Sequence, residues 1–226
     1  MRKLFISPWL ILSSFLIPFV SANPKAFVIE EFLSIIEKTQ NLTIRQEYDS
    51  AIIIINSVSK EYPRSPVGYY IKMITLEARM IDYENTDDEK EFLKTFNEGN
   101  SLMDSILQES GEPWYLYFKG AMLVSLAIHQ LRFTEYFNGT LMMLKGIDFL
   151  EKSHGKDSTL SDALLYPALY KYAKKQIKNK FSWAAFWHRK TDNTAISLIE
   201  KCSVESYFSK EISRQVLIGL YTREKE

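Results

Sequence analysis

The chain has 226 residues, of which 46% are hydrophobic, and its 28 basic residues are matched by 28 acidic ones. This length and composition can bury a sizeable core, which excludes an intrinsically disordered protein. The balanced charge gives no general attraction for nucleic acid, so we expect none as a partner. The single cysteine, Cys202, cannot form an intrachain disulfide, so packing alone must hold the fold.

The first 22 residues have the pattern of a secretory signal peptide. Two basic residues precede an apolar stretch, residues 4–17, which is shorter than the roughly 20 residues that a membrane span needs. Small residues at 20–22 then offer a cleavage site, and no cysteine follows for lipid attachment. We therefore expect a mature chain of residues 23–226, located in the periplasm or secreted. Without Arg2 and Lys3 it carries 26 basic residues against 28 acidic ones.

In the mature chain, apolar residues recur at spacings of three and four, while Gly and Pro are scarce and fall between these periodic segments. This pattern indicates an all-α fold. Thr86 and Glu89 have the spacing of a capping box at the start of one helix, and Pro63 stands just past the end of another. The connections are short, so successive helices should pack antiparallel. The predicted helices cover residues 25–40, 45–61, 66–82, 88–109, 113–131, 135–153, 160–178, 191–203 and 207–223.

The second of these helices has a regular spacing of large and small residues before a terminal proline: Tyr48, Ala51, Ile55, Val58 and Pro63. Small residues let neighbouring helices approach closely, and the large ones fill the groove between them. Similar spacing recurs in WYLYFKGA and DALLYPALYKY, which read as first helices of later hairpins. The segments with such patterns are residues 48–63, 79–84, 114–121, 162–172 and 191–202.

On these segments the chain resembles a group of exported bacterial tetratricopeptide-like repeat proteins, over most of residues 45–221. The resemblance implies antiparallel helical hairpins stacked as a right-handed superhelix, an α-solenoid that forms one domain over residues 23–226. Two features depart from the group's pattern. Pro167 lies inside a predicted helix, where it predicts a kink, and residues 83–90 read as an insertion.

Aromatic residues gather on the predicted first helices of successive hairpins. In tetratricopeptide superhelices these helices line a concave surface that binds extended peptides or helices, so the resemblance implies a binding role for them. Tyrosine combines a rigid apolar ring with a polar tip, which suits recognition. The alternative is that these rings pack between helices. The candidate binding residues on these helices are Tyr69, Tyr70, Trp114, Tyr117, Tyr166 and Tyr170.

The run KKQIKNKFSWAAFWHRK, residues 174–190, alternates basic and aromatic side chains. Trp183, Phe186 and Trp187 share one helical face, with basic residues beside it. These aromatics either fill the groove between repeats or contact a protein or a membrane surface, and Trp183 and Trp187 complete the candidate binding residues. Nucleic-acid binding uses the same basic and aromatic side chains, but the export signal argues against it.

The sequence offers no chemistry typical of an enzyme. His129, His154 and His188 are far apart, no pair of them has metal-ligand spacing, and no histidine lies near Cys202 in the sequence. A Gly-rich phosphate loop, a nucleophile elbow and a zinc-helix motif are all missing from the sequence. We therefore predict no catalytic residue, no metal site and no cofactor.

The last predicted helix carries more apolar surface than one neighbour readily covers. Either the chain is a truncated relative of longer proteins, or this end docks a partner or a second copy. The residues concerned are Phe208, Ile212, Val216 and Leu220, broadened by Tyr207, Leu217 and Tyr221.

Together these patterns favour a non-enzymatic exported scaffold that binds a protein or peptide partner in the bacterial cell envelope, an inference by analogy of fold. The alternative is a periplasmic helical carrier that closes around a small ligand. A carrier of this kind requires a deep, enclosed cavity of several hundred cubic ångströms.

Overall fold

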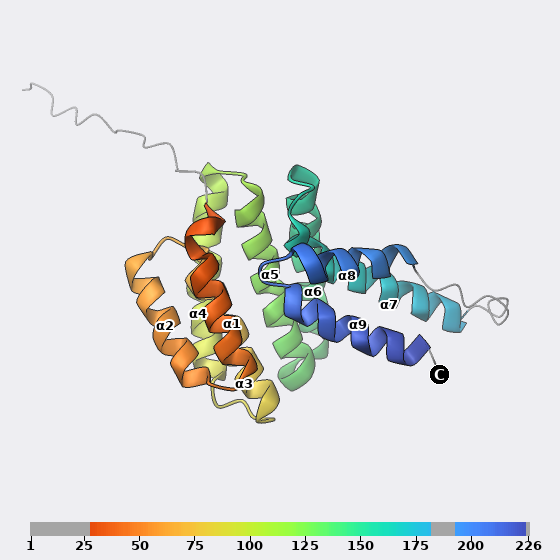
Figure 1. Cartoon of the computed structure of the whole chain (residues 1–226), viewed down its shortest axis with the longest axis horizontal. Helices are drawn as coiled ribbons and strands as arrows, with labels where there is room; N and C mark the ends of the chain where they lie inside the picture. The colour runs from red at the N-terminus through yellow and green to blue at the C-terminus, as the bar shows by residue number, and fades with distance from the viewer. Residues whose placement is uncertain (1–27, 182–192, 225–226) are drawn as a thin grey trace, which may run out of the picture.

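The computed structural model describes residues 28–181 and 193–224 (Figure 1). Within these ranges the chain is all-α and contains no strand, which confirms the all-α part of the predicted fold. None of the helices in these ranges is long and apolar enough to cross a membrane. The expected signal peptide, and Trp183, Phe186 and Trp187, lie outside the described residues. The helices are α1 (Leu33–Ile44), α2 (Tyr48–Glu61), α3 (Pro66–Asp82), α4 (Glu89–Glu109), α5 (Pro113–His129), α6 (Tyr136–Lys156), α7 (Leu165–Phe181), α8 (Asn193–Glu205) and α9 (Lys210–Glu224).

Helices α1 to α6 run alternately up and down beside one another (Figure 1). Each packs on the next along the chain, and α3 also packs on both α1 and α5. Helix α5 is the centre of this group, because nearly all of its residues are buried. It is apolar on every side, as expected for a helix surrounded by others. The six helices share one core, which includes Ile29 in the 3-10 turn before α1 and Leu150 of α6, and to which Leu160, Ala163 and Phe208 also belong.

The contact between α5 and α6 is unusually close, and two glycines explain it. Gly120 of α5 faces Gly146 of α6, and a Cβ atom added at Gly120 would lie only 2.8 Å from the Gly146 carbonyl oxygen. Gly146 stands in the same relation to the Gly120 carbonyl, again at 2.8 Å. Helix backbones approach this closely only where side chains are missing. Gly120 is one of the small residues of WYLYFKGA, the segment whose spacing predicts close approach of neighbouring helices.

The last three helices lie across the direction of the first six (Figure 1). Helix α7 leaves the body, α8 returns toward it and α9 leaves again, and α8 packs on both of its neighbours. A short 3-10 turn, η3 (Ser161–Leu164), makes the change of direction and contacts α5, α6, α7 and α8. These helices have a second apolar cluster of their own, built from residues such as Leu165, Ile199 and Leu217.

Two local predictions from the sequence were wrong. The predicted capping box at Thr86 does not start α4, which begins at Glu89 with Asp88 as its N-cap residue. The Asp88 carboxylate accepts hydrogen bonds from Arg79 of α3 instead, so a tertiary ion pair sets this helix start. The kink predicted at Pro167 does not arise, because α7 begins only at Leu165. Pro167 thus stands in the first turn, where its missing N–H has no helical partner to lose.

Candidate functional site

A cluster of aromatic rings joins the first six helices to the last three. Phe208, in the connection between α8 and α9, is its central member and is buried. Its ring stacks on Tyr117 of α5 with centroids 5.7 Å apart, and it meets Tyr70 of α3 edge-on at 5.3 Å. Trp114 and Phe118 of α5 complete the cluster. The connection between α8 and α9 is therefore inserted into the core of the first six helices.

The Asp162 carboxylate in η3 holds this connection in place. One carboxylate oxygen accepts hydrogen bonds from the backbone N–H groups of Phe208 and Ser209, at 2.8 and 2.9 Å, and the other accepts from the N–H of Tyr207 at 2.8 Å. Burial raises the pKa of Asp162, while these N–H donors act in the opposite direction. An anion at this place satisfies backbone donors just before α9 that would otherwise lack partners.

Replacing Asp162 with alanine should lower the free energy of unfolding by about 3 kcal/mol, because three buried backbone donors lose a charged acceptor. Hydrogen exchange at the amides of Tyr207, Phe208 and Ser209 should accelerate more than exchange at the amides of α5. Asp157→Ala is the matched control. Asp157 also accepts from a backbone N–H, that of Thr159 at 2.9 Å, but this hydrogen bond is exposed to solvent, so we expect a loss of about 1 kcal/mol or less. Equal losses in the two variants would contradict the assigned role of Asp162.

Glu77 of α3 is a second buried carboxyl group near this junction. One of its oxygens accepts a hydrogen bond from the Ser125 hydroxyl of α5, and the other is buried with no hydrogen-bond partner. Burial raises the pKa of Glu77 to about 8, so the neutral acid dominates at pH 7. Burial likewise raises the pKa of Tyr70, Tyr117 and Tyr166 above the ordinary tyrosine value. These groups are uncharged at neutral pH and enclosed by the packed helices.

The structure brings only some of the predicted binding residues together. Tyr70, Trp114 and Tyr117 meet in the aromatic cluster, where Tyr70 and Tyr117 are buried. Tyr69 is half-buried and packs beside Gly99 of α4. For Tyr70 and Tyr117, these positions favour the alternative interpretation as interhelical packing.

The remaining predicted residues lie along α7 or beyond it. Tyr166 is half-buried, and its charge interaction with Tyr70 places it near the cluster. Tyr170 is exposed, and the Lys174 ammonium lies over its ring at 5.9 Å. Trp183 and Trp187 lie outside the described residues. The described residues contain no group of three or more His, Cys, Asp or Glu side chains placed to hold a metal ion.

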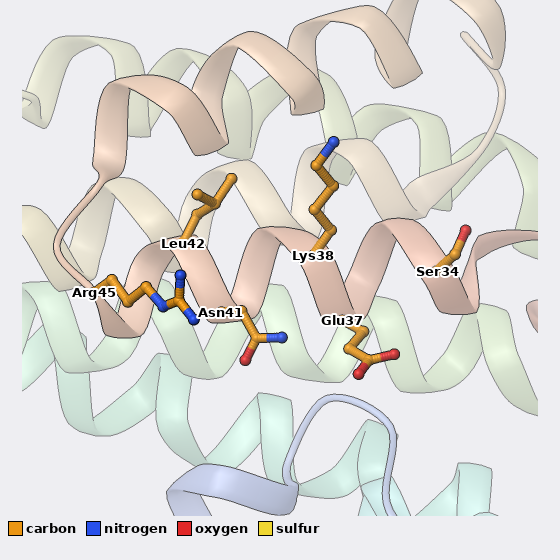
Figure 2. Close-up of a pocket in the computed structure, with 6 residues that line it drawn as sticks. All are labelled: Ser34, Glu37, Lys38, Asn41, Leu42 and Arg45. Carbon is orange, nitrogen blue, oxygen red and sulfur yellow. The ribbon is translucent and has the colours of Figure 1, made fainter.

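A depression of about 440 Å³ lies on α1 and is open to solvent. Most of its lining residues are polar or charged, and Figure 2 shows Lys38 and Leu42 pointing to one side of the helix and Glu37 and Asn41 to the other. Side chains that diverge in this way cannot converge on one small molecule. The depression therefore lacks the deep, enclosed form that a carrier requires. It is lined by Ser34, Glu37, Lys38, Asn41, Leu42 and Arg45.

The most exposed large apolar side chains in the described part of the chain are at the start of α6. Tyr136 is 79% exposed and Phe137 is 74% exposed. Leu141 and Leu144, four and seven residues after Phe137, continue the stripe along the same side and are each 41% exposed. We call Tyr136, Phe137, Leu141 and Leu144 the α6 apolar face. Burying such a face requires another molecule, since soluble monomers rarely expose large contiguous apolar patches.

Sequence reasoning missed the α6 apolar face because it looked for aromatic residues on first helices, and α6 is the second helix of its hairpin. The sequence feature that could have revealed this face is that α6 has apolar residues on two sides. Gly139 and Gly146 face α5 and Ile147 is buried, while Phe137 and Leu141 are exposed. A helix with two apolar sides needs two neighbours.

The predicted docking surface on α9 is partly covered. Phe208, Leu217 and Leu220 are buried and Val216 is half-buried, whereas Ile212 and Tyr221 are exposed. The Tyr221 hydroxyl donates a hydrogen bond to Glu200 of α8. Ile218, outside the predicted surface, is also exposed.

No family model, no curated protein and no solved structure matches this chain.

Proposed function

We propose that this protein is a non-enzymatic, exported helical scaffold that binds a protein partner through the α6 apolar face. The observation that carries the proposal is the exposure of Tyr136 and Phe137, at 79% and 74%. Aromatic side chains of this kind are enriched at the centres of protein interfaces, where they supply most of the binding energy. Exposing the apolar surface of two neighbouring rings to water is unfavourable for a monomer. Burying that surface against a partner lowers the free energy.

Two further observations support the scaffold and its location. Helix α3 packs directly on both α1 and α5, while α2 and α4 connect these helices along the chain and pack against them, an arrangement expected of tetratricopeptide-like hairpins. The pattern of residues 1–22 supports export, which would place the partner in the bacterial cell envelope. The open, polar depression on α1 offers less support for a small-ligand carrier, which was the alternative from sequence.

A photoreactive phenylalanine analogue at position 137 tests this function in cells that make the protein. We expect crosslinked adducts from position 137 in the envelope fraction. The same analogue at position 53 is the control, because Ile53 on α2 is 68% exposed but is not part of the α6 apolar face. Tyr136→Ser should weaken the adducts formed at position 137. Equal adducts at both positions, or none at position 137, would contradict the proposal.

A further inference from the structure

We infer that the α6 apolar face pairs with the same face of a second copy of this chain, as an antiparallel helix pair with two-fold symmetry. This inference rests on the proposed function, because it assigns the occupant of the same surface. A two-fold pair uses one patch twice, so each residue must face an acceptable residue of the other copy. The arrangement of residues along α6 meets this condition.

The apolar residues match in one antiparallel register. If the two-fold axis passes beside Thr140 and Leu141, Phe137 of each copy lies opposite Leu144 of the other copy. Thr140 is exposed and small, so the helices can approach closely at the axis. Its hydroxyl already donates a hydrogen bond to the Tyr136 carbonyl at 3.0 Å. The hydroxyl therefore keeps a hydrogen-bond partner when a second copy covers it.

The charges beside this face favour the same orientation. Glu135 precedes the first turn of α6 and Lys145 lies about two and a half turns further along, and both are exposed. In the antiparallel register, Glu135 of each copy comes within reach of Lys145 of the other. A parallel pair would instead place Glu135 beside Glu135 and Lys145 beside Lys145, which is repulsive. The helix is thus charge-complementary to itself only when antiparallel.

The area available predicts a weak dimer. Each aromatic side chain can bury about 150–250 Å², and the two leucines and their polar neighbours add to this, so the pair would bury on the order of 1,000 Å² in total. This is the lower limit for a specific interface and well below the area of obligate dimers. We therefore expect reversible association that depends on concentration, with a dissociation constant in the micromolar range.

Sedimentation equilibrium of the mature chain, from about 1 μM to about 1 mM, tests this inference. We expect a reversible monomer–dimer equilibrium that Phe137→Glu weakens by at least about tenfold. Ile218→Glu is the matched control, because Ile218 on α9 is 67% exposed but lies outside the α6 apolar face. A second measurement uses Thr140→Cys, which lies at the proposed axis and should form a disulfide-linked dimer under mild oxidation. The Ile53→Cys variant should not.

The charges give a test of the register. Glu135→Lys and Lys145→Glu should each weaken the dimer several-fold, and the double variant should restore it, because the swapped charges again face opposite ones. A monomer at all concentrations, or a dimer lost in Ile218→Glu but retained in Phe137→Glu, would overturn the inference. If the purified chain stays monomeric while position 137 still crosslinks to a different protein, this inference fails and the proposed function stands. If neither occurs, both fail.

Discussion

Replacing Gly120 with leucine should lower the free energy of unfolding by about 3 kcal/mol. A Cβ atom at this position would lie 2.8 Å from the Gly146 carbonyl oxygen, 2.9 Å from Leu150 Cγ and 3.0 Å from the Leu150 backbone nitrogen. Two of these three atoms belong to the backbone of α6, so the clash can be relieved only by moving the helix. Thermal unfolding should show a midpoint lowered by about 6–12 °C for a chain of this size.

Gly219→Leu separates packing from the effect of glycine on helix stability. Gly219 also lies within a helix, but nothing stands within 4 Å of the Cβ position there. Leucine at this exposed site should raise stability by up to about 1 kcal/mol, since glycine is a poor helix former. If Gly120→Leu unfolds at the same temperature as the parent protein, the close contact between α5 and α6 does not exist as described.

Helix positions could be predicted well where local chemistry sets them. The predicted starts of α3 and α5 coincide with the observed ones, at Pro66 and Pro113. Proline suits the first turn of a helix, and the Ser65 side chain accepts a hydrogen bond from the Val67 N–H at the start of α3. The start of α4 was predicted to within one residue, but its capping was predicted wrongly, because Asp88 is the N-cap residue and pairs with Arg79 of a different helix. A capping motif is predicted from neighbouring residues alone. It therefore does not take account of an ion pair with a residue of another helix.

The change of direction at η3 could not be predicted from the sequence. Asp162 was interpreted as a residue near the start of an ordinary helix, since no nearby residue signals another role. Its actual hydrogen-bond partners, the N–H groups of residues 207–209, are 45 to 47 positions further along the chain. Periodicity reports which residues share a helical face, but it does not report which distant segment that face meets.

The candidate site shows the same limitation. The apolar spacing of α6 could be read from the sequence, but the choice of buried side depends on where α5 approaches, and this is decided by the facing glycines, Gly120 and Gly146. Phe137 is left on the outside as a result. Tyr70 and Tyr117 were correctly placed on first helices, yet Phe208 from a distant connection covers them. Residue type alone does not separate a buried tyrosine from a binding one.

The stability of the protein should fall between about pH 5 and pH 8 because of Glu77. Burial raises the pKa of Glu77 from 4.5 to about 8, so the folded state retains a proton that the unfolded state releases in this range. The contribution of Glu77 is therefore fully present below pH 4.5 and is lost progressively as the pH rises to about 8. A shift of this size corresponds to a change on the order of 4–5 kcal/mol in the free energy of unfolding, measured by chemical denaturation across the range.

Glu77→Gln should remove most of this pH dependence, because glutamine stays neutral and can still accept a hydrogen bond from Ser125. At pH 9 we expect this variant to be more stable than the parent protein, whereas at pH 5 the two should differ little. Glu91→Gln is the matched control: Lys72 lowers the pKa of Glu91, so its removal should leave the slope between pH 5 and pH 8 unchanged. Burial also raises the pKa of Asp162, which is unchanged in both variants. A parent protein whose stability is flat from pH 5 to pH 9, or a Glu77→Gln variant with the parent's slope, would show that Glu77 is ionised in the folded state and that solvent or a charged neighbour reaches it.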